Sequence, residues 1–95
     1  MTYDLEFKKS ALKEWKKLGA TIQSQFKKKL TDILSNPHIE SAKLSGGNEL
    51  YKIKLRQAGY RLVYEVNDTV VTVTVISVGK RDKGKVYKAA MERIN

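Results

Sequence analysis

The sequence contains no cysteine, and it has only one histidine and one proline among its 95 residues. Without cysteine the chain has no disulfide, no thiolate metal ligand and no cysteine nucleophile, which suits a reducing compartment. The one histidine, His38, cannot by itself form a metal site, a Cys–His pair or a two-histidine ribonuclease site. Any catalytic chemistry therefore has to come from other side chains, and we expect no cofactor.

The chain also lacks a long apolar run. Its longest apolar stretch, residues 70–78, is interrupted by threonine and serine and is shorter than the ~20 residues that span a bilayer. The first residues show no apolar core of a signal peptide, and the acidic residues are too scattered to suggest a two-metal site. These absences predict a cytoplasmic protein with no membrane span and no metal.

Positive charge dominates what is present. Lysine and arginine number 19 against 10 aspartates and glutamates, which gives a formal net charge of +9. Such an excess indicates a polyanionic partner, and charge alone does not choose between nucleic acid, an acidic protein and an anionic membrane surface. The length and the hydrophobic content of 41% fit one globular domain over residues 1–95, burying roughly 60–70% of its unfolded surface.

Hydrophobic periodicity predicts the order strand, helix, helix, three strands, helix. Gly19 is expected to cap the end of the first helix and Thr21 the start of the second, which Asn36-Pro37 would terminate. The expected elements are a strand at 2–7, helices at 8–18 and 22–35, a loop at 38–48, strands at 51–56, 61–66 and 69–78, and a last helix along Val86, Ala90 and Ile94.

This order predicts an α+β fold. Three consecutive strands with short links form an antiparallel meander, to which the N-terminal strand adds in a small antiparallel sheet. The N-terminal helical hairpin covers one face of the sheet, and we expect the other face to be free for chemistry. Because the apolar faces of the helices are then buried in the core, we expect no membrane partner.

The stretch 51–66 is the most informative part of the chain. Tyr51, Ile53 and Leu55 alternate with three cations, so a strand here has one apolar face and one basic face. If Arg56 pairs with the glycine at 59, then Lys54 lies opposite Arg61. Like charges directly opposite on a sheet are destabilising, which favours an anion in front of them. A solvated basic face is the alternative that the sequence leaves open.

Lysine, arginine and tyrosine are the side chains left for catalysis. Arginine binds two phosphate oxygens at once and stays charged. Clustered cations lower the pKa of a neighbouring lysine or tyrosine, so either can move a proton. RNA cleavage by its own 2′-hydroxyl without metal or histidine is therefore physically possible. The alternative is a surface that grips phosphate without chemistry.

The chain resembles the RelE toxins of bacterial toxin–antitoxin modules over nearly its whole length. The motifs that carry the resemblance are ALKEWxKLG at 11–19, KL at 43–44, YKIKLRxxGYRLVY at 51–64, VISVGKR at 75–81 and VY at 86–87. The resemblance implies the microbial-ribonuclease-like RelE fold and a ribosome-dependent endonuclease that cuts mRNA in the ribosomal A site and halts translation.

The resemblance also implies site residues and partners. The family's functional positions fall on Lys52, Lys54, Arg61, Arg81 and Tyr87. The two arginines would hold the phosphate, and the tyrosine and a lysine would handle the 2′-hydroxyl proton, with a lysine or Arg81 serving the leaving group. The implied partners are a RelB-type antitoxin, the 70S ribosome with its mRNA and 16S rRNA, and operator DNA, bound through a toxin–antitoxin complex that represses its own operon.

Two points stay open. Relatives often carry an arginine in the loop where this chain has Ser45, which bears on how the codon is seated. The wider superfamily includes ParE-type gyrase poisons, which lack this set of lysines, arginines and tyrosine. A nuclease-inactive member that binds a protein such as gyrase, or nucleic acid, is the alternative function.

Overall fold

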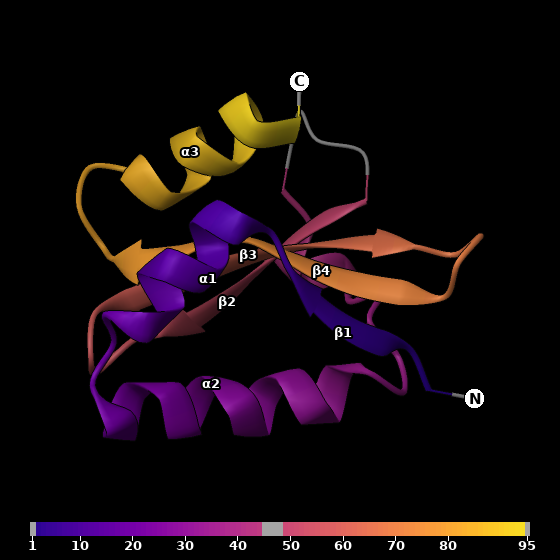
Figure 1. Cartoon of the computed structure of the whole chain (residues 1–95), viewed down its shortest axis with the longest axis horizontal. Coiled ribbons are helices and arrows are strands. Elements are labelled where there is room, and N and C mark those ends of the chain that lie inside the picture. Colours follow the sequence, from indigo (N-terminus) through magenta and orange to yellow (C-terminus); the bar gives the residue numbers. More distant parts are fainter. Residues whose placement is uncertain (1, 45–48, 95) are drawn as a thin grey trace.

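The computed structural model describes residues 2–44 and 49–94, so Ser45 lies outside the described residues. The elements confirm the predicted order (Figure 1). They are β1 (Asp4–Phe7), α1 (Lys9–Lys16), α2 (Ala20–Ile33), the short 3₁₀ helix η1 (Glu40–Ala42), β2 (Leu50–Leu55), β3 (Tyr60–Asn67), β4 (Thr72–Lys80) and α3 (Lys85–Ile94). In the part of the chain that the structure describes, no helix is long and apolar enough to cross a membrane.

The strands form one sheet in the order β1-β4-β3-β2. The predicted antiparallel meander of β2, β3 and β4 is confirmed. β1 pairs with β4 in parallel, with Phe7 opposite Val75, so the sheet is mixed rather than wholly antiparallel. The parallel pairing is possible because the chain crosses the sheet through α1 and α2 before it returns, and parallel neighbours need such a long connection.

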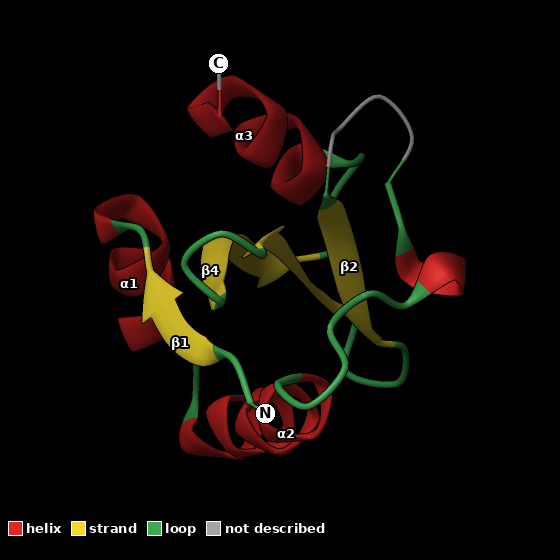
Figure 2. Ribbon diagram, turned by 90° about the vertical axis from the view of Figure 1, so that its right-hand side faces the viewer, coloured by secondary structure: helices red, strands yellow, loops and turns green. Residues whose placement is uncertain are grey.

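One face of the sheet carries the larger apolar core, which α2 covers, while α1 lies beside β1 at the edge of the sheet (Figure 2). Phe26, Leu30 and Ile33 of α2 are buried there, as the apolar stripe predicts. From β2 the same core receives Tyr51 and Ile53, whereas the alternating Lys52 and Lys54 are only half-buried. The predicted division of β2 into an apolar and a basic face is therefore confirmed.

The opposite face is not free, contrary to expectation. Helix α3 lies across it, on the other side of the sheet from α2 (Figure 1). Val63 and Ile76 of the sheet pack there with Val86 and Ala90 of α3 in a second apolar cluster. Without the helix this apolar surface would face water. The basic side chains therefore occupy one end of the face rather than all of it.

The joint between α1 and α2 also differs from its prediction. Gly19 is the N-cap of α2 in an extended conformation, with φ −65°, and does not take the left-handed conformation of a helix C-cap glycine. Helix α1 ends earlier, with Lys17 as its C-cap, and α2 begins at Ala20, so Thr21 lies inside the helix and is not its N-cap. The Gln23 side chain of α2 donates to the Trp15 carbonyl at 2.8 Å and so caps the end of α1.

A polar cluster around the single histidine joins four segments at the end of the sheet remote from the hairpin turn. His38 Nε2 lies 2.9 Å from Asp68 Oδ1, and His38 Nδ1 lies 3.1 Å from Glu49 Oε2 and 2.9 Å from the Tyr51 hydroxyl. The two ring nitrogens contact different carboxylates, and one ligand atom from each of His38, Glu49 and Asp68 lies within 4.8 Å of the others. The Tyr3 hydroxyl also donates to Asp68.

We expect the acidity of Asp68 to contribute to stability. The hydrogen bond from Tyr3, followed by that from His38, lowers the pKa of Asp68 below its ordinary 3.8. A lowered carboxyl pKa stabilises the folded state above the ordinary value, and this contribution is lost as the pH falls through the lowered one. Asp68→Asn should therefore lower the melting temperature at pH 7, and the gap to the wild type should narrow below pH ~3.8. Circular dichroism melts across pH 7 to 3 measure this, with Asp32→Asn as control; a gap that does not change with pH would contradict it.

Two charged side chains cover the edge of β4 beyond its pairing with β1. Glu14 of α1 accepts a hydrogen bond from the Val78 N–H (3.3 Å), and Arg93 of α3 donates to the Ile76 carbonyl (2.8 Å). The same two side chains form a bidentate ion pair, with N–O distances of 2.8 and 3.1 Å. The pair thus satisfies sheet-edge groups and ties α1 to α3, which the sequence separation of 79 residues concealed.

Removing one member of this pair should cost stability. Arg93→Met would leave a partly buried carboxylate and the Ile76 carbonyl without their donor, which should lower the free energy of unfolding by about 1–3 kcal/mol. Urea denaturation measures it. Lys88→Met, on an exposed position of the same helix, is the matched control. A loss no larger than the control's would mean that the pair behaves as an ordinary surface ion pair.

Candidate active site

The register of the meander places Lys54, Arg61 and Gly79 side by side across three strands. Lys54 lies opposite Arg61, as predicted, and Arg61 lies opposite Gly79. The Arg61 side chain is buried, with 8% of the residue exposed, and its guanidinium donates to the Tyr60 carbonyl at 3.1 Å. Among the described residues no carboxylate forms a salt bridge with it. A buried cation without a counter-ion is costly, which favours an anion as its missing partner.

Gly79 lets α3 approach this row of residues. A Cβ atom at Gly79 would lie 3.6 Å from Cγ2 of Val86, at ordinary contact distance. A side chain larger than a methyl group would therefore meet the helix. The glycine ends the row of side chains and allows the first turn of α3 to lie beside Arg61.

The segment between β4 and α3 is fixed by backbone hydrogen bonds. The Arg81 N–H donates to the Gly59 carbonyl at 2.7 Å, which ties the segment to the hairpin turn. Lys83 and Gly84 both have positive φ, 49° and 74°, and reverse the chain before the helix. Lys85 N–H donates to the Asp82 carbonyl at 2.9 Å. These contacts place Arg81 and the first turn of α3 next to the basic end of the sheet.

A cavity of about 150 Å³ lies where these elements meet; we call it the basic cavity. Its lining residues are Lys54, Arg61, Lys80, Arg81, Asp82, Gly84, Lys85, Val86 and Tyr87. Four of the five predicted site residues are thus brought together. Lys52 does not line this cavity; it borders a separate hollow of about 320 Å³ beside Lys29 and Ile39. Sequence reasoning missed Lys80, Asp82 and Lys85, although five cations fall within residues 80–88 and could have drawn attention to them.

The Tyr87 hydroxyl is a free polar group in this lining. Its oxygen is shielded from solvent and has no hydrogen-bond partner within the described ranges 2–44 and 49–94. The ring itself is half-buried and packs against the apolar cluster under α3. A buried hydroxyl without a partner costs free energy, so a bound ligand that supplies one would be favoured there.

The cations of this region act on one another. Lys52, followed by desolvation and by Arg61, lowers the pKa of the Lys54 amine, and Arg56 and Arg81 contribute in the same direction. The lowered pKa gives Lys54 a larger neutral fraction than an isolated lysine has at neutral pH. An amine with this property can accept a proton as well as donate one.

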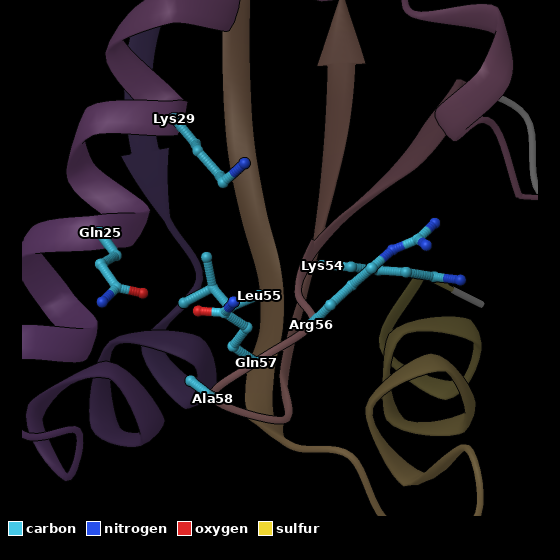
Figure 3. Close-up of a pocket in the computed structure, with 7 residues that line it drawn as sticks. All are labelled: Gln25, Lys29, Lys54, Leu55, Arg56, Gln57 and Ala58. Carbon is cyan, nitrogen blue, oxygen red and sulfur yellow. The ribbon is translucent and has the colours of Figure 1, made fainter.

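A larger hollow, of about 370 Å³, lies between α2 and the turn of the β2–β3 hairpin (Figure 3); we call it the hairpin groove. Its lining residues are Gln25, Lys29, Lys54, Leu55, Arg56, Gln57 and Ala58. Lys54 borders both the groove and the basic cavity. The side chains of Lys54 and Arg56 extend from the rim toward the side where α3 lies, away from Gln25 (Figure 3).

Comparison with known proteins assigns this chain to a family. Residues 5–84 match the model of ParE toxins of type II toxin–antitoxin systems. The chain is 56% identical over 94 residues to the mRNA interferase toxin RelE of Escherichia coli strain K12, an alignment that covers 99% of both chains. The chain belongs to the RelE/ParE family of type II toxins. The resemblance drawn from the sequence motifs is thereby confirmed.

Solved structures agree with this placement of the toxin. A variant of the E. coli toxin RelE in the free state matches with a TM-score of 0.93 at 55% identity, and 100% of both chains is covered. RelE from the intact E. coli RelBE toxin–antitoxin complex matches with a TM-score of 0.82 at 57% identity, covering 85% of this chain and 99% of that one. The predicted RelE fold is therefore confirmed.

The effect of the neighbouring cations on the pKa of Lys54 in this toxin can be measured directly. Lys52→Gln should raise the pKa of Lys54 toward its ordinary 10.5 and Arg81→Gln should raise it by less, because Lys52 is the largest cause of the shift and Arg81 the smallest. NMR titration of the Lys54 side-chain amine measures both shifts. Lys28→Gln removes an exposed charge from α2 and should leave Lys54 unchanged. Equal effects of all three variants would mean that net charge, not the local cluster, sets the shift.

Proposed function

We propose that this toxin is an endoribonuclease that cleaves mRNA in the ribosomal A site, using the RNA's own 2′-hydroxyl and no metal. The observation that carries the proposal is the basic cavity, in which Lys54, Arg61, Arg81 and Tyr87 meet around space for an anion. The E. coli relative is named an mRNA interferase, which supports the same reaction class for this chain.

The reaction needs three things from the protein: a base for the 2′-hydroxyl, stabilisation of the phosphate charge, and an acid for the leaving 5′-oxygen. The 2′-oxygen attacks phosphorus while the bond from phosphorus to the 5′-oxygen breaks, which leaves a 2′,3′-cyclic phosphate and a 5′-hydroxyl. Arg61 and Arg81 are suited to bind the phosphate oxygens, whose negative charge grows in the transition state. Lys54 and Tyr87 are the groups placed to take the 2′-hydroxyl proton and to protonate the leaving 5′-oxygen. Lys52 then acts chiefly through its charge, because it lies outside the cavity.

The size of the cavity supports dependence on the ribosome. Its volume of about 150 Å³ lies below the range of roughly 300–1,000 Å³ for small-molecule sites, which suits a phosphoryl group better than a whole nucleotide. The cavity alone therefore does not hold RNA in the in-line arrangement that the attack requires. Much of the rate must then come from the ribosome, which orients the RNA for attack. The A site provides an mRNA that is already held in place.

The partners follow from the same proposal. A RelB-type antitoxin is supported by the E. coli RelBE complex, whose toxin chain is 57% identical to this one. The remaining excess of positive charge suits contacts with 16S rRNA and, within the toxin–antitoxin complex, with operator DNA in repression of its own operon. Action on the ribosome places the toxin in the cytoplasm.

Primer-extension mapping on programmed ribosomes tests the proposal. Wild-type toxin should cut within the A-site codon only when ribosomes are present. Arg81→Ala should slow cleavage by about 10²–10³-fold, because it removes a donor to the developing oxyanion, while ribosome binding should stay within a few-fold.

Lys28→Ala is the matched control, since it removes a charge from the exposed face of α2. Cleavage of free RNA at the same rate would remove the ribosome from the mechanism. No cleavage by wild-type toxin, together with tight binding to ribosomes or gyrase, would replace the nuclease by the binding function.

A further inference from the structure

We propose that the hairpin groove is a subsite for the nucleotide next to the cleaved phosphate, with Gln25 and Gln57 contacting its base. The inference rests on the proposed function and extends it to residues outside the predicted set of site residues. Gln25 of α2 and Gln57 of the hairpin turn face the same space from opposite sides, and Lys29 extends toward it from α2 (Figure 3).

The groove adjoins the basic cavity, because Lys54 borders both. The cavity suits a phosphoryl group, so the sugars and bases attached to that phosphate have to lie outside it. Lys54 borders both spaces, and its side chain and that of Arg56 leave the rim of the groove toward the α3 side (Figure 3). A strand of RNA held by these two cations at its phosphates therefore has its next base within reach of the groove.

The volume of the groove fits this occupant. About 370 Å³ falls at the lower end of the range for small-molecule sites, which suits one nucleotide rather than a folded RNA or a protein segment. Leu55 is almost wholly buried, and the exposed Ala58 provides apolar surface in the lining, against which the flat face of a base can pack. The groove thus combines an apolar surface with polar groups around it.

The polar groups are of the kind that reads base edges. A glutamine amide offers donors and an acceptor together and can pair with the edge of an unstacked base. Strand β2 is also the edge strand of the sheet, with only β3 beside it over residues 52–55 in the described chain. An edge strand presents unpaired N–H and C=O groups, and Lys54 and Leu55 of this strand line the groove.

Among the consecutive lysines at 27–29 of α2, Lys29 is the one that lines the groove, which Lys54 and Arg56 of the hairpin also line. In the run Lys27-Lys28-Lys29 all three side chains are exposed, but of the three only Lys29 borders the groove and the adjoining hollow beside Lys52. Consecutive helical residues are turned by about 100° from one another, so the other two point elsewhere. Lys28 is therefore a matched control for Lys29, because it is also an exposed lysine on α2.

Cleavage kinetics on programmed ribosomes provide the first test. A set of mRNAs that differ in one base of the A-site codon should be discriminated by wild-type toxin, and Gln25→Ala/Gln57→Ala should reduce that discrimination roughly three- to tenfold by removing hydrogen bonds to the base. Lys29→Gln should raise KM by a similar factor with kcat unchanged, while Lys28→Gln should alter neither. Retention of full discrimination by the double variant would overturn the proposal.

A titration without ribosomes separates this inference from the proposed function. A 2′-O-methyl trinucleotide cannot be cleaved, and at low salt it should shift the side-chain amide NMR signals of Gln25 and Gln57. The shifts should weaken in Lys29→Gln and persist in Lys28→Gln. If the amides shift although wild-type toxin does not cut mRNA, the proposed function fails and the groove remains an RNA site.

The opposite results overturn the groove alone. Shifts confined to Arg81 and Tyr87, with both glutamine amides unmoved, would leave the nuclease and remove the subsite. A loss of ribosome affinity in Lys29→Gln that is equal for all codons, with unmoved amides, would assign Lys29 to ribosomal RNA instead of mRNA.

Discussion

The enforced proximity of Lys54 and Arg61 is the constraint around which this fold is built. Opposite positions on neighbouring strands bring like charges together, which opposes pairing. The register holds because a slip of one residue would turn Tyr51, Ile53 and Leu55 out of the larger core. The apolar clusters on the two faces of the sheet therefore hold the cations in place, and the stored repulsion favours an anion in front of them.

The position of Tyr87 depends on contacts at both ends of α3. Near the start of the helix the Ser77 hydroxyl donates to the Val86 carbonyl at 2.7 Å, and Gly79 leaves room for the valine itself. Near its end Arg93 binds α1 and the edge of β4. The apolar residues between them attach the helix to the sheet. A side chain that completes the basic cavity is thus held by contacts at both ends of its helix.

Local patterns of the sequence account for most of the elements and for the register of the hairpin. Alternation at 51–56 separates the apolar and basic faces of β2, and the stripe through Phe26 and Leu30 defines α2. Long-range pairing was beyond such patterns. The parallel pairing of β1 and the bridge from Glu14 to Arg93 depend on which distant segments meet, and no local period encodes this.

The same distinction applies to the site. Family motifs identified Lys54, Arg61, Arg81 and Tyr87, and the structure brings these four together. It separates Lys52, because the cavity lies between α3 and the end of β2 that carries Lys54. The hairpin groove could not be predicted, since Gln25 and the turn residue Gln57 share it only once α2 packs beside the hairpin.

The charge field at Lys54 has a consequence for catalysis. In the free toxin, neighbouring cations and desolvation lower the pKa of its amine. A bound phosphodiester brings one negative charge, and the attacking 2′-oxygen adds a second as the pentacoordinate phosphate forms. Each added negative charge favours protonated Lys54 and raises its pKa again. The amine therefore becomes a stronger base as the attack proceeds. A cluster of cations can in this way take the place of the histidine and the metal, provided the RNA is held firmly enough for the attack to begin.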